Sequence, residues 1–251
     1  MTLIIDGCHT PSNLVMCTSD SKVVTYLNYH KNGSTGKPIP LKNNKEKVLQ
    51  LTDRVLIRTG GVEGLGKLFI KKLKKRIKSD DPLENCKKHA EDIYAEMVEQ
   101  KSKGKGSMWL KYLYDERGLP VAINGFYADG TTGLIILVDN EWLEVNHNER
   151  WVTSMVAPPS KKDNKIMEYL NRFSRIKEPG THHMFAEFWE THKELYQINK
   201  QTISEDMHIH GIKKVNEEYR YFNIELPDVD DEEKAMYIYK ALMEMDVIDQ
   251  S

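Results

Sequence analysis

The sequence predicts an α+β protein built as a four-layer αββα sandwich, in which two antiparallel sheets are flanked by helices. Short apolar segments separated by tight turns favour strands joined as hairpins. These segments alternate in blocks with amphipathic helical segments, in the order strands, two helices, four strands, two helices, two strands and one helix. Helix pairs outside two packed sheets would bury every apolar face in that order.

The first quarter of the chain is predicted to be extended. A turn containing Pro11 joins the first two strands, and a Thr-Asp turn at residues 52–53 joins the last two. Residues 31–46 are polar and carry two glycines and two prolines, so they are predicted to form a loop. The predicted extended segments are residues 3–6, 13–18, 23–27, 47–51 and 54–59.

Two helices are expected after the glycine pair at residues 60–61. In the first, an apolar residue recurs every four positions and the lysines occupy the other side. The second begins near Pro82, because proline suits the first turn of a helix. The apolar stripes are Leu65, Phe69, Leu73 and Ile77 in the first helix, and Leu83, Cys86, Ala90, Ile93 and Met97 in the second.

The rest of the chain continues the same alternation. Turns with glycine, aspartate or asparagine separate four more strands, and acidic residues precede the last helix, where they suit its N-terminus. The predicted strands are residues 108–114, 120–127, 133–139, 141–145, 207–213 and 219–225, and the predicted helices are residues 162–173, 182–198 and the segment after Pro227. We expect one domain over residues 1–251, with residues 228–251 as a C-terminal helical extension.

Composition narrows the classes of function. Thirty-six basic and 38 acidic residues give a net charge of −2, which argues against an electrostatic grip on nucleic acid. The apolar runs are too short for a membrane helix, and the first residues lack the positive flank of a signal peptide. Three cysteines form an odd count without metal-ligand spacing. We therefore expect a cytoplasmic protein that binds neither membrane nor nucleic acid.

Several local motifs occur in a consistent register. Residues 14–22 resemble a strand that runs into an A-[ST]-[DE]-x-[RK] turn, and residues 47–51 fit K-[ILV]-x-x-[IL]. Residues 61–64 fit G-x-x-[GA], beginning 14 residues after the lysine, and residues 124–139 resemble a G-[YF]-D-x-x-G hairpin followed by hhxhD. Together these segments resemble the proteasome β-subunit family of N-terminal nucleophile (Ntn) hydrolases, most clearly over residues 2–145.

The resemblance implies a threonine-type peptidase. Thr2 would be the nucleophile once Met1 is removed, and its α-amine, with an ordinary pKa of about 7.7–8.0, would be the base. Lys47 would hold that amine unprotonated by charge repulsion, Asp20 would orient Lys47, and the Gly61 amide would face the oxyanion. The resemblance also implies polypeptide substrates, a homo-oligomeric ring, an ATP-driven unfoldase as partner, and neither metal nor cofactor.

The sequence departs from the family in two places. Residues 153–160 lack the glycine-serine turn that supports the nucleophile. Residues 199–204 stand where the family has D-x-x-S-G-G, with asparagine for the aspartate, threonine for the serine and neither glycine. The alternative is therefore a catalytically inactive, proteasome-like scaffold or binding protein.

Two other chemistries compete with this interpretation. Residues 61–67 fit the phosphate-binding pattern G-x-x-x-x-G-K, so a P-loop nucleotide-binding protein is a minor alternative, although Leu68 replaces the metal-binding hydroxyl and Glu63 would repel phosphate. His208 and His210 would share one face of a strand, but no third metal ligand is identifiable. His182, His183 and His192 are interpreted, with these two, as solvated or core-edge histidines.

Overall fold

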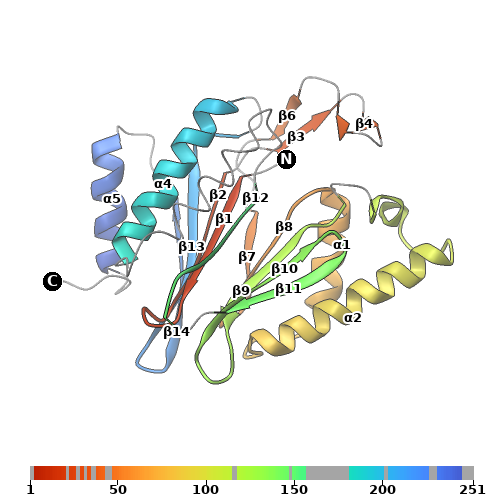
Figure 1. The fold of residues 1–251 in the computed structure, drawn as a ribbon, viewed down its shortest axis with the longest axis horizontal. Helices are drawn as coiled ribbons and strands as arrows, with labels where there is room; N and C mark the ends of the chain where they lie inside the picture. The colour runs from red at the N-terminus through yellow and green to blue at the C-terminus, as the bar shows by residue number, and fades with distance from the viewer. Residues whose placement is uncertain are drawn as a thin grey trace.

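The computed structural model describes residues 3–20, 23–26, 29–30, 33–34, 38–42, 47–114, 118–146, 149–156, 181–200, 203–225 and 231–244. Two five-stranded antiparallel sheets form its centre (Figure 1). The predicted helix at residues 162–173 lies outside the described residues, as does Thr2.

The first sheet has the strand order β12-β1-β2-β13-β14. Each pair of neighbouring strands is antiparallel, and β1 is bonded on both sides, to β2 and to β12. The strands are β1 (Ile4–His9), β2 (Leu14–Asp20), β12 (Val152–Val156), β13 (Met207–Val215) and β14 (Glu218–Glu225).

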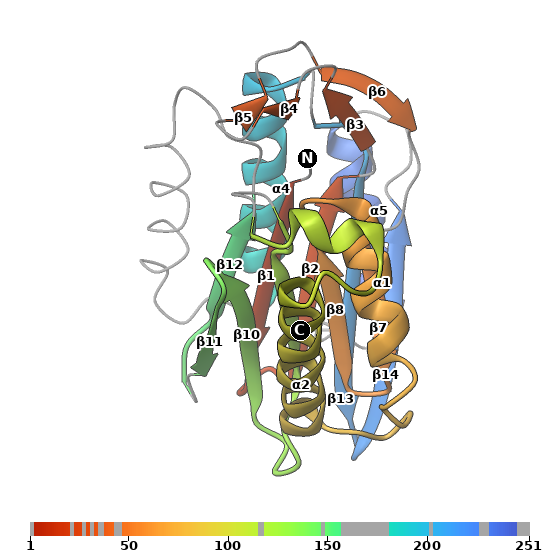
Figure 2. The same cartoon turned by 90° about the vertical axis from the view of Figure 1, so that its right-hand side faces the viewer.

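The second sheet has the strand order β11-β10-β9-β8-β7, again antiparallel throughout. Its strands are β7 (Val48–Thr52), β8 (Val55–Thr59), β9 (Val121–Phe126), β10 (Thr132–Val138) and β11 (Glu141–Asn146). Two small hairpins follow β2 in the sequence: β3 (Val23–Tyr26) pairs with β6 (Pro38–Lys42), and β4 (Tyr29–His30) with β5 (Gly33–Ser34). The β3–β6 hairpin projects past the end of the sheets where β1 begins (Figures 1 and 2).

Helices cover the outer faces of both sheets. Helices α4 (Thr181–Ile198) and α5 (Asp231–Glu244) lie on the first sheet, whereas α1 (Glu63–Leu73), α2 (Leu83–Ser102) and the short 3-10 helix η1 (Met108–Tyr112) lie on the second. In Figure 2, α2 lies in front of the stacked sheets, and α4 and α5 lie behind them. The predicted four-layer αββα fold class is confirmed.

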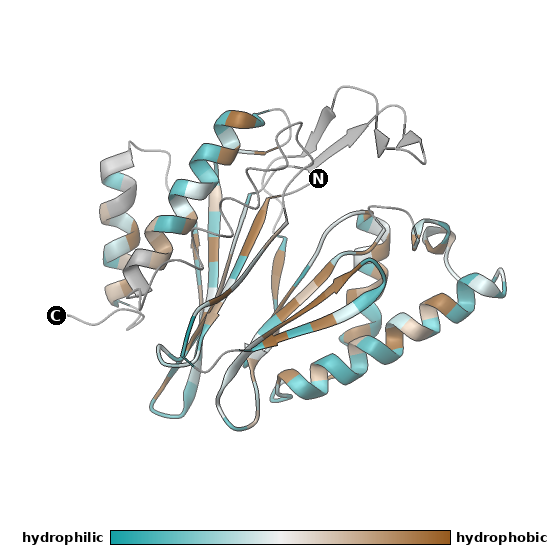
Figure 3. Ribbon diagram, viewed as in Figure 1, coloured by the Kyte–Doolittle hydropathy of each residue, from teal (hydrophilic) through white to brown (hydrophobic). Residues whose placement is uncertain are grey.

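Three apolar cores separate the four layers. Strand β1 contributes alternate side chains to two of them. Leu3 and Ile5 pack under α4, whereas Ile4 and Cys8 lie in the core between the two sheets. Successive side chains of a strand point to opposite faces, so β1 is apolar on both sides and its even-numbered residues face the second sheet. Figure 3 shows apolar residues gathered on the strands of both sheets, with hydrophilic bands along α2.

Several sequence predictions of local structure differ from the structure. Residues 108–114 are not a strand: Ser107 Oγ accepts from the Trp109 amide at 3.4 Å, and the buried residues Leu110 and Leu113 are three apart, the repeat of a 3-10 turn. The predicted loop at residues 31–46 contains β5 and β6, and β12 was not predicted. A single domain over residues 1–251 stays a prediction, although Ile238 and Leu242 of α5 pack into the core beneath α4.

Within the described part of the chain, no helix is both long and apolar enough to cross a membrane.

Candidate active site

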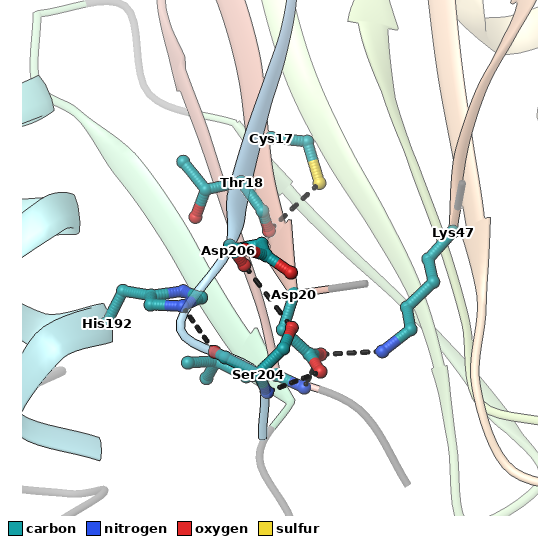
Figure 4. A network of polar contacts seen from close by, with 8 residues as sticks. Cys17, Thr18, Asp20, Lys47, His192, Ser204 and Asp206 are labelled. Atoms are coloured by element: carbon teal, nitrogen blue, oxygen red, sulfur yellow. Dashed lines mark hydrogen bonds and ion pairs between the residues drawn. The ribbon is translucent and has the colours of Figure 1, made fainter. Parts of the chain in front are cut away.

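Asp20 and Lys47 form an ion pair that crosses between the two sheets. Asp20 ends β2 in the first sheet, and Lys47 directly precedes β7 in the second. Lys47 Nζ lies 2.6 Å from Asp20 Oδ1, and their side chains are only 8% and 0% exposed. Figure 4 shows the lysine reaching across to the carboxylate. The structure thus brings together two of the four predicted site residues.

The Asp20 carboxylate also holds the start of the first strand. The Leu3 amide donates to Asp20 Oδ1 at 2.7 Å, and the Asp20 amide donates to the Leu3 carbonyl at 3.1 Å. The Ser204 amide donates to Asp20 Oδ2 at 3.3 Å. A fully buried carboxylate needs several donors to offset lost hydration, and these come from three separate segments. Asp20 therefore fixes Lys47 next to the residue where β1 begins.

Gly61 lies at the same end of the second sheet. Val48 pairs with Arg58 in the antiparallel ladder. Lys47 lies one residue before Val48 and Gly61 lies three residues after Arg58, so both are beyond the same end of this pair. Gly61 is exposed and has a φ of 66°, a left-handed conformation that favours glycine. The Val62 amide donates to the Gly118 carbonyl at 3.2 Å, which anchors the loop behind it. The third predicted site residue is thus close in register to Lys47.

Thr2, the fourth predicted site residue, lies outside the described residues. Its neighbour Leu3 is described and fully buried.

His192 is a part of the site region that the sequence did not reveal. It lies on α4 and is 1% exposed, so it is not a solvated histidine. Its Nε2 lies 3.1 Å from the Ser204 carbonyl oxygen, next to the amide that serves Asp20. Burial lowers the pKa of His192, and the nearby Asp20 carboxylate offsets this only in part. The imidazole is therefore neutral near pH 7.

A second buried ion pair links the sheets further along β1. Arg58 Nη2 lies 2.5 Å from Asp6 Oδ2, both side chains are 1% exposed, and Ser154 Oγ donates to the same oxygen at 2.7 Å. The Cys17 thiol donates to Asp6 Oδ1 at 3.1 Å, and burial raises the pKa of that thiol. A sequence signal exists here, because each charge interrupts an apolar run: Leu-Ile-Ile before Asp6 and Val-Leu-Ile before Arg58.

The phosphate-binding alternative is wrong. Gly66 and Lys67 lie inside α1 rather than in a loop, and only Gly61 precedes the helix. Lys67 Nζ pairs with Glu63 at 2.8 Å. The surrounding strands are antiparallel, whereas such loops occur in parallel sheets built from βαβ units.

The two histidines of β13 do share a face, as the sequence predicted. The His208 and His210 rings stack at 6.4 Å, and His210 Nδ1 lies 2.9 Å from the Tyr221 hydroxyl.

Comparison with solved structures shows the fold. Anbu (Gly-1) mutant from Hyphomicrobium sp. strain MC1 matches with a TM-score of 0.60 and 7% identity, over 100% of this chain and 99% of that one. Anbu (ancestral beta-subunit) from Yersinia bercovieri matches with a TM-score of 0.59 and 10% identity, over 97% and 94%. The fold is proteasome-like.

The comparisons correct the predicted family. No family model and no curated protein sequence matches the chain. Two of the matching structures are of Anbu, one of them described as an ancestral β-subunit, at 7% and 10% identity. The predicted membership in the proteasome β-subunit family is therefore wrong. What the comparisons show is a related fold.

Proposed function

We propose that the protein is a threonine-type N-terminal nucleophile peptidase that hydrolyses peptide bonds. The observation that carries the proposal is the buried Asp20–Lys47 pair, which is hydrogen-bonded to the Leu3 amide at the start of β1. A buried cation is costly unless it is paired, and a cation beside the start of the chain would serve to keep a terminal amine unprotonated as the base.

Two features support a location of Thr2 beside Lys47. The peptide bond holds the Cα of residue 2 about 3.8 Å from that of Leu3, whose amide already bonds to Asp20. In addition, residue 2 has the same parity as Ile4 and Asp6, whose side chains face the second sheet. If the extended conformation of β1 continues back to residue 2, strand alternation would direct a Thr2 hydroxyl to that side, toward Lys47.

The proposed chemistry uses these groups in sequence. Removal of Met1 frees the Thr2 amine, which the Lys47 ammonium would keep unprotonated by like-charge repulsion. The amine takes the hydroxyl proton as Oγ attacks the scissile carbonyl carbon, and the Gly61 amide donates to the resulting oxyanion. The ammonium of Thr2 then protonates the leaving amine, which leaves an acyl ester on Oγ. Water activated by the same amine hydrolyses the ester and restores the hydroxyl.

The test combines intact mass with turnover of unfolded protein or peptide mixtures. We expect the mass of a chain that begins at Thr2, loss of hydrolysis in Thr2→Ala and partial retention in Thr2→Ser. Retained Met1 together with unchanged hydrolysis by Thr2→Ala would refute the proposal. A mature Thr2 terminus without any turnover would instead favour the catalytically inactive scaffold.

We further propose that the protein acts in the cytoplasm as a homo-oligomeric ring, with an ATP-driven unfoldase supplying polypeptide substrates. Exposed apolar side chains on the outermost helix support an assembly, because monomers rarely expose such clusters. They are Met236, Tyr237 and Tyr239 of α5. Native mass spectrometry is expected to show a closed oligomer, and a monomer at micromolar concentration would contradict this part of the proposal.

A further inference from the structure

The segment that carries Ser204 lies between α4 and β13 in the sequence. Residues 203–206 belong to neither a helix nor a strand. Ile203 anchors one side through its buried side chain and its amide, which donates to the Asn199 carbonyl at 3.0 Å. The next residue, Ser204, forms hydrogen bonds to Asp20 and His192.

The two backbone groups of Ser204 face different partners. Its amide donates to Asp20 Oδ2 at 3.3 Å, whereas its carbonyl oxygen lies 3.1 Å from His192 Nε2. These groups flank one Cα, so a bond to the carbonyl restricts the direction of the amide. Figure 4 shows the resulting chain of contacts from α4 through Ser204 and Asp20 to Lys47.

The protonation of His192 fits a donor role. A neutral imidazole that donates from Nε2 to a carbonyl has an acceptor at Nδ1. Among the described residues, Nδ1 is buried without a hydrogen-bond partner. A buried acceptor that lacks a partner costs about 1–3 kcal/mol, a penalty that an apolar residue at position 192 would avoid.

We propose that His192 is a positioning residue of the active site: its Nε2–H fixes Ser204, which in turn holds the Asp20 carboxylate against Lys47. The role rests on the proposed peptidase function, because it acts through the pair that would keep the Thr2 amine unprotonated.

The experiment compares His192→Gln, whose side-chain amide can donate from nearly the same place, with His192→Leu, which cannot donate. His9 supplies the matched control, since it is also buried, bonds to Ser12 Oγ at 2.6 Å and stacks on Trp151. It lies six residues along β1 from Leu3, about 20 Å at the rise of a strand. His9→Leu therefore reports the effect of losing a buried histidine far from Asp20.

Three quantities are measured at a temperature where all variants are folded: kcat/KM for a peptide substrate, the pKa of the Thr2 amine from the pH dependence of its carbamylation by cyanate, and exchange of the Ser204 amide hydrogen. We expect His192→Leu to lower kcat/KM by about 10- to 100-fold, as displaced catalytic groups do. It should also raise the amine pKa and speed exchange at Ser204. His192→Gln and His9→Leu should stay within about threefold of the parent in kcat/KM, the scatter of such comparisons.

The inference is overturned if His192→Leu keeps the parent's kcat/KM and amine pKa, or if His192→Gln loses as much as His192→Leu at equal melting temperature. Failure of the proposed function gives a different result, because Thr2→Ala would then keep the parent's turnover. In that case His192 positions no active site, whatever its effect on Ser204.

Discussion

Two buried ion pairs dominate the chemistry at the scale of single residues. Asp20–Lys47 and Asp6–Arg58 each join a strand of the first sheet to one of the second. Taking both charges out of water costs several kcal/mol per ion, and only close pairing and further hydrogen bonds offset that cost. Asp20 accepts further bonds from the amides of Leu3 and Ser204. Asp6 accepts them from the side chains of Ser154 and Cys17. Loss of one partner should therefore be far worse than loss of an exposed ion pair.

Lys47→Met is expected to lower the free energy of unfolding by about 3–5 kcal/mol, because it leaves the Asp20 carboxylate buried without its cation. Urea denaturation at pH 7 measures the change. The double variant Asp20→Asn/Lys47→Met should recover part of the loss, since it removes the charge as well. Lys67→Met is the control: Lys67 is 71% exposed in its pair with Glu63, and its loss should cost less than about 1 kcal/mol. Equal effects at Lys47 and Lys67 would show that the inter-sheet pair contributes little.

His210 is expected to make the protein sensitive to acid. Burial, with the neighbouring His208 charge, lowers the pKa of His210 to about 4 from its ordinary 6.5. The unfolded chain therefore binds a proton more readily, and stability that is fully present above pH 6.5 is lost as the pH falls toward 4. The loss amounts to about 3 kcal/mol.

The measurement is urea unfolding of the parent and of His210→Gln between pH 7.5 and 4.5. Both chains contain other groups that titrate in this range, including His9 and His192, whose pKa values burial also lowers. The diagnostic quantity is the difference between the two curves, which should shrink steadily as the pH falls. Parallel curves would mean that His210 does not contribute.

At the scale of elements, periodic segments were predicted well. The apolar stripe of α2 matches its buried residues, and Leu65, Phe69 and Leu73 are the buried face of α1. Ile77 continues the same spacing, yet α1 ends at Leu73. The prediction extended too far because the spacing of apolar side chains alone does not mark where a helix ends. Residues 108–112 are too few to establish a period, and their apolar residues indicated a strand instead of η1.

Two strands that depend on their pairing partners were not predicted. The edge strand β12 exists because β1 offers it a free row of backbone groups, and β6 because it pairs with β3. Neither segment has a strong pattern of its own. The same holds for the candidate site: Asp20 and Lys47 belong to local motifs, but His192 and Ser204 meet only when α4 packs on the first sheet.

Gly211→Ala is expected to destabilise the β13–β14 hairpin and with it the protein. Gly211 pairs directly with Phe222, and a Cβ built on Gly211 would lie only 2.0 Å from the Phe222 ring. Phe222 is buried in the core beneath α4 and α5, so the ring has little room to move. Overpacking of this kind costs about 1–3 kcal/mol, measured as a lower urea midpoint. Gly104→Ala provides a contrast without crowding, because nothing lies within 4 Å of its Cβ and any loss there comes from its φ of 61°.

Phe222→Leu in the Gly211→Ala background should restore part of the stability, because a smaller side chain leaves space for the new methyl group. If the two substitutions are instead simply additive, the contact between them is not the cause of the loss.

At the scale of the whole molecule, the two sheets are held together by an apolar core with charges at its centre. Ile4 and Val15 of the first sheet meet Leu56 and Phe126 of the second, and the Asp6–Arg58 pair lies in the same layer. The fold class followed from the order of elements, because only a few arrangements bury every apolar face. The contact between particular strands did not, because the pairing of β2 with β13 joins residues almost 200 positions apart.

This arrangement predicts that the sheets unfold together. Arg58→Met leaves the Asp6 carboxylate buried and unpaired, so we expect a loss of about 3–5 kcal/mol. Because the pair bridges both sheets, the loss should appear in each. Hydrogen exchange in urea can follow amides of β2 and β9 separately, and both sets should become exposed at one lowered midpoint. If β9 keeps the parent's midpoint while β2 unfolds earlier, the sheets are separate cooperative units and the inter-sheet pair stabilises only the first.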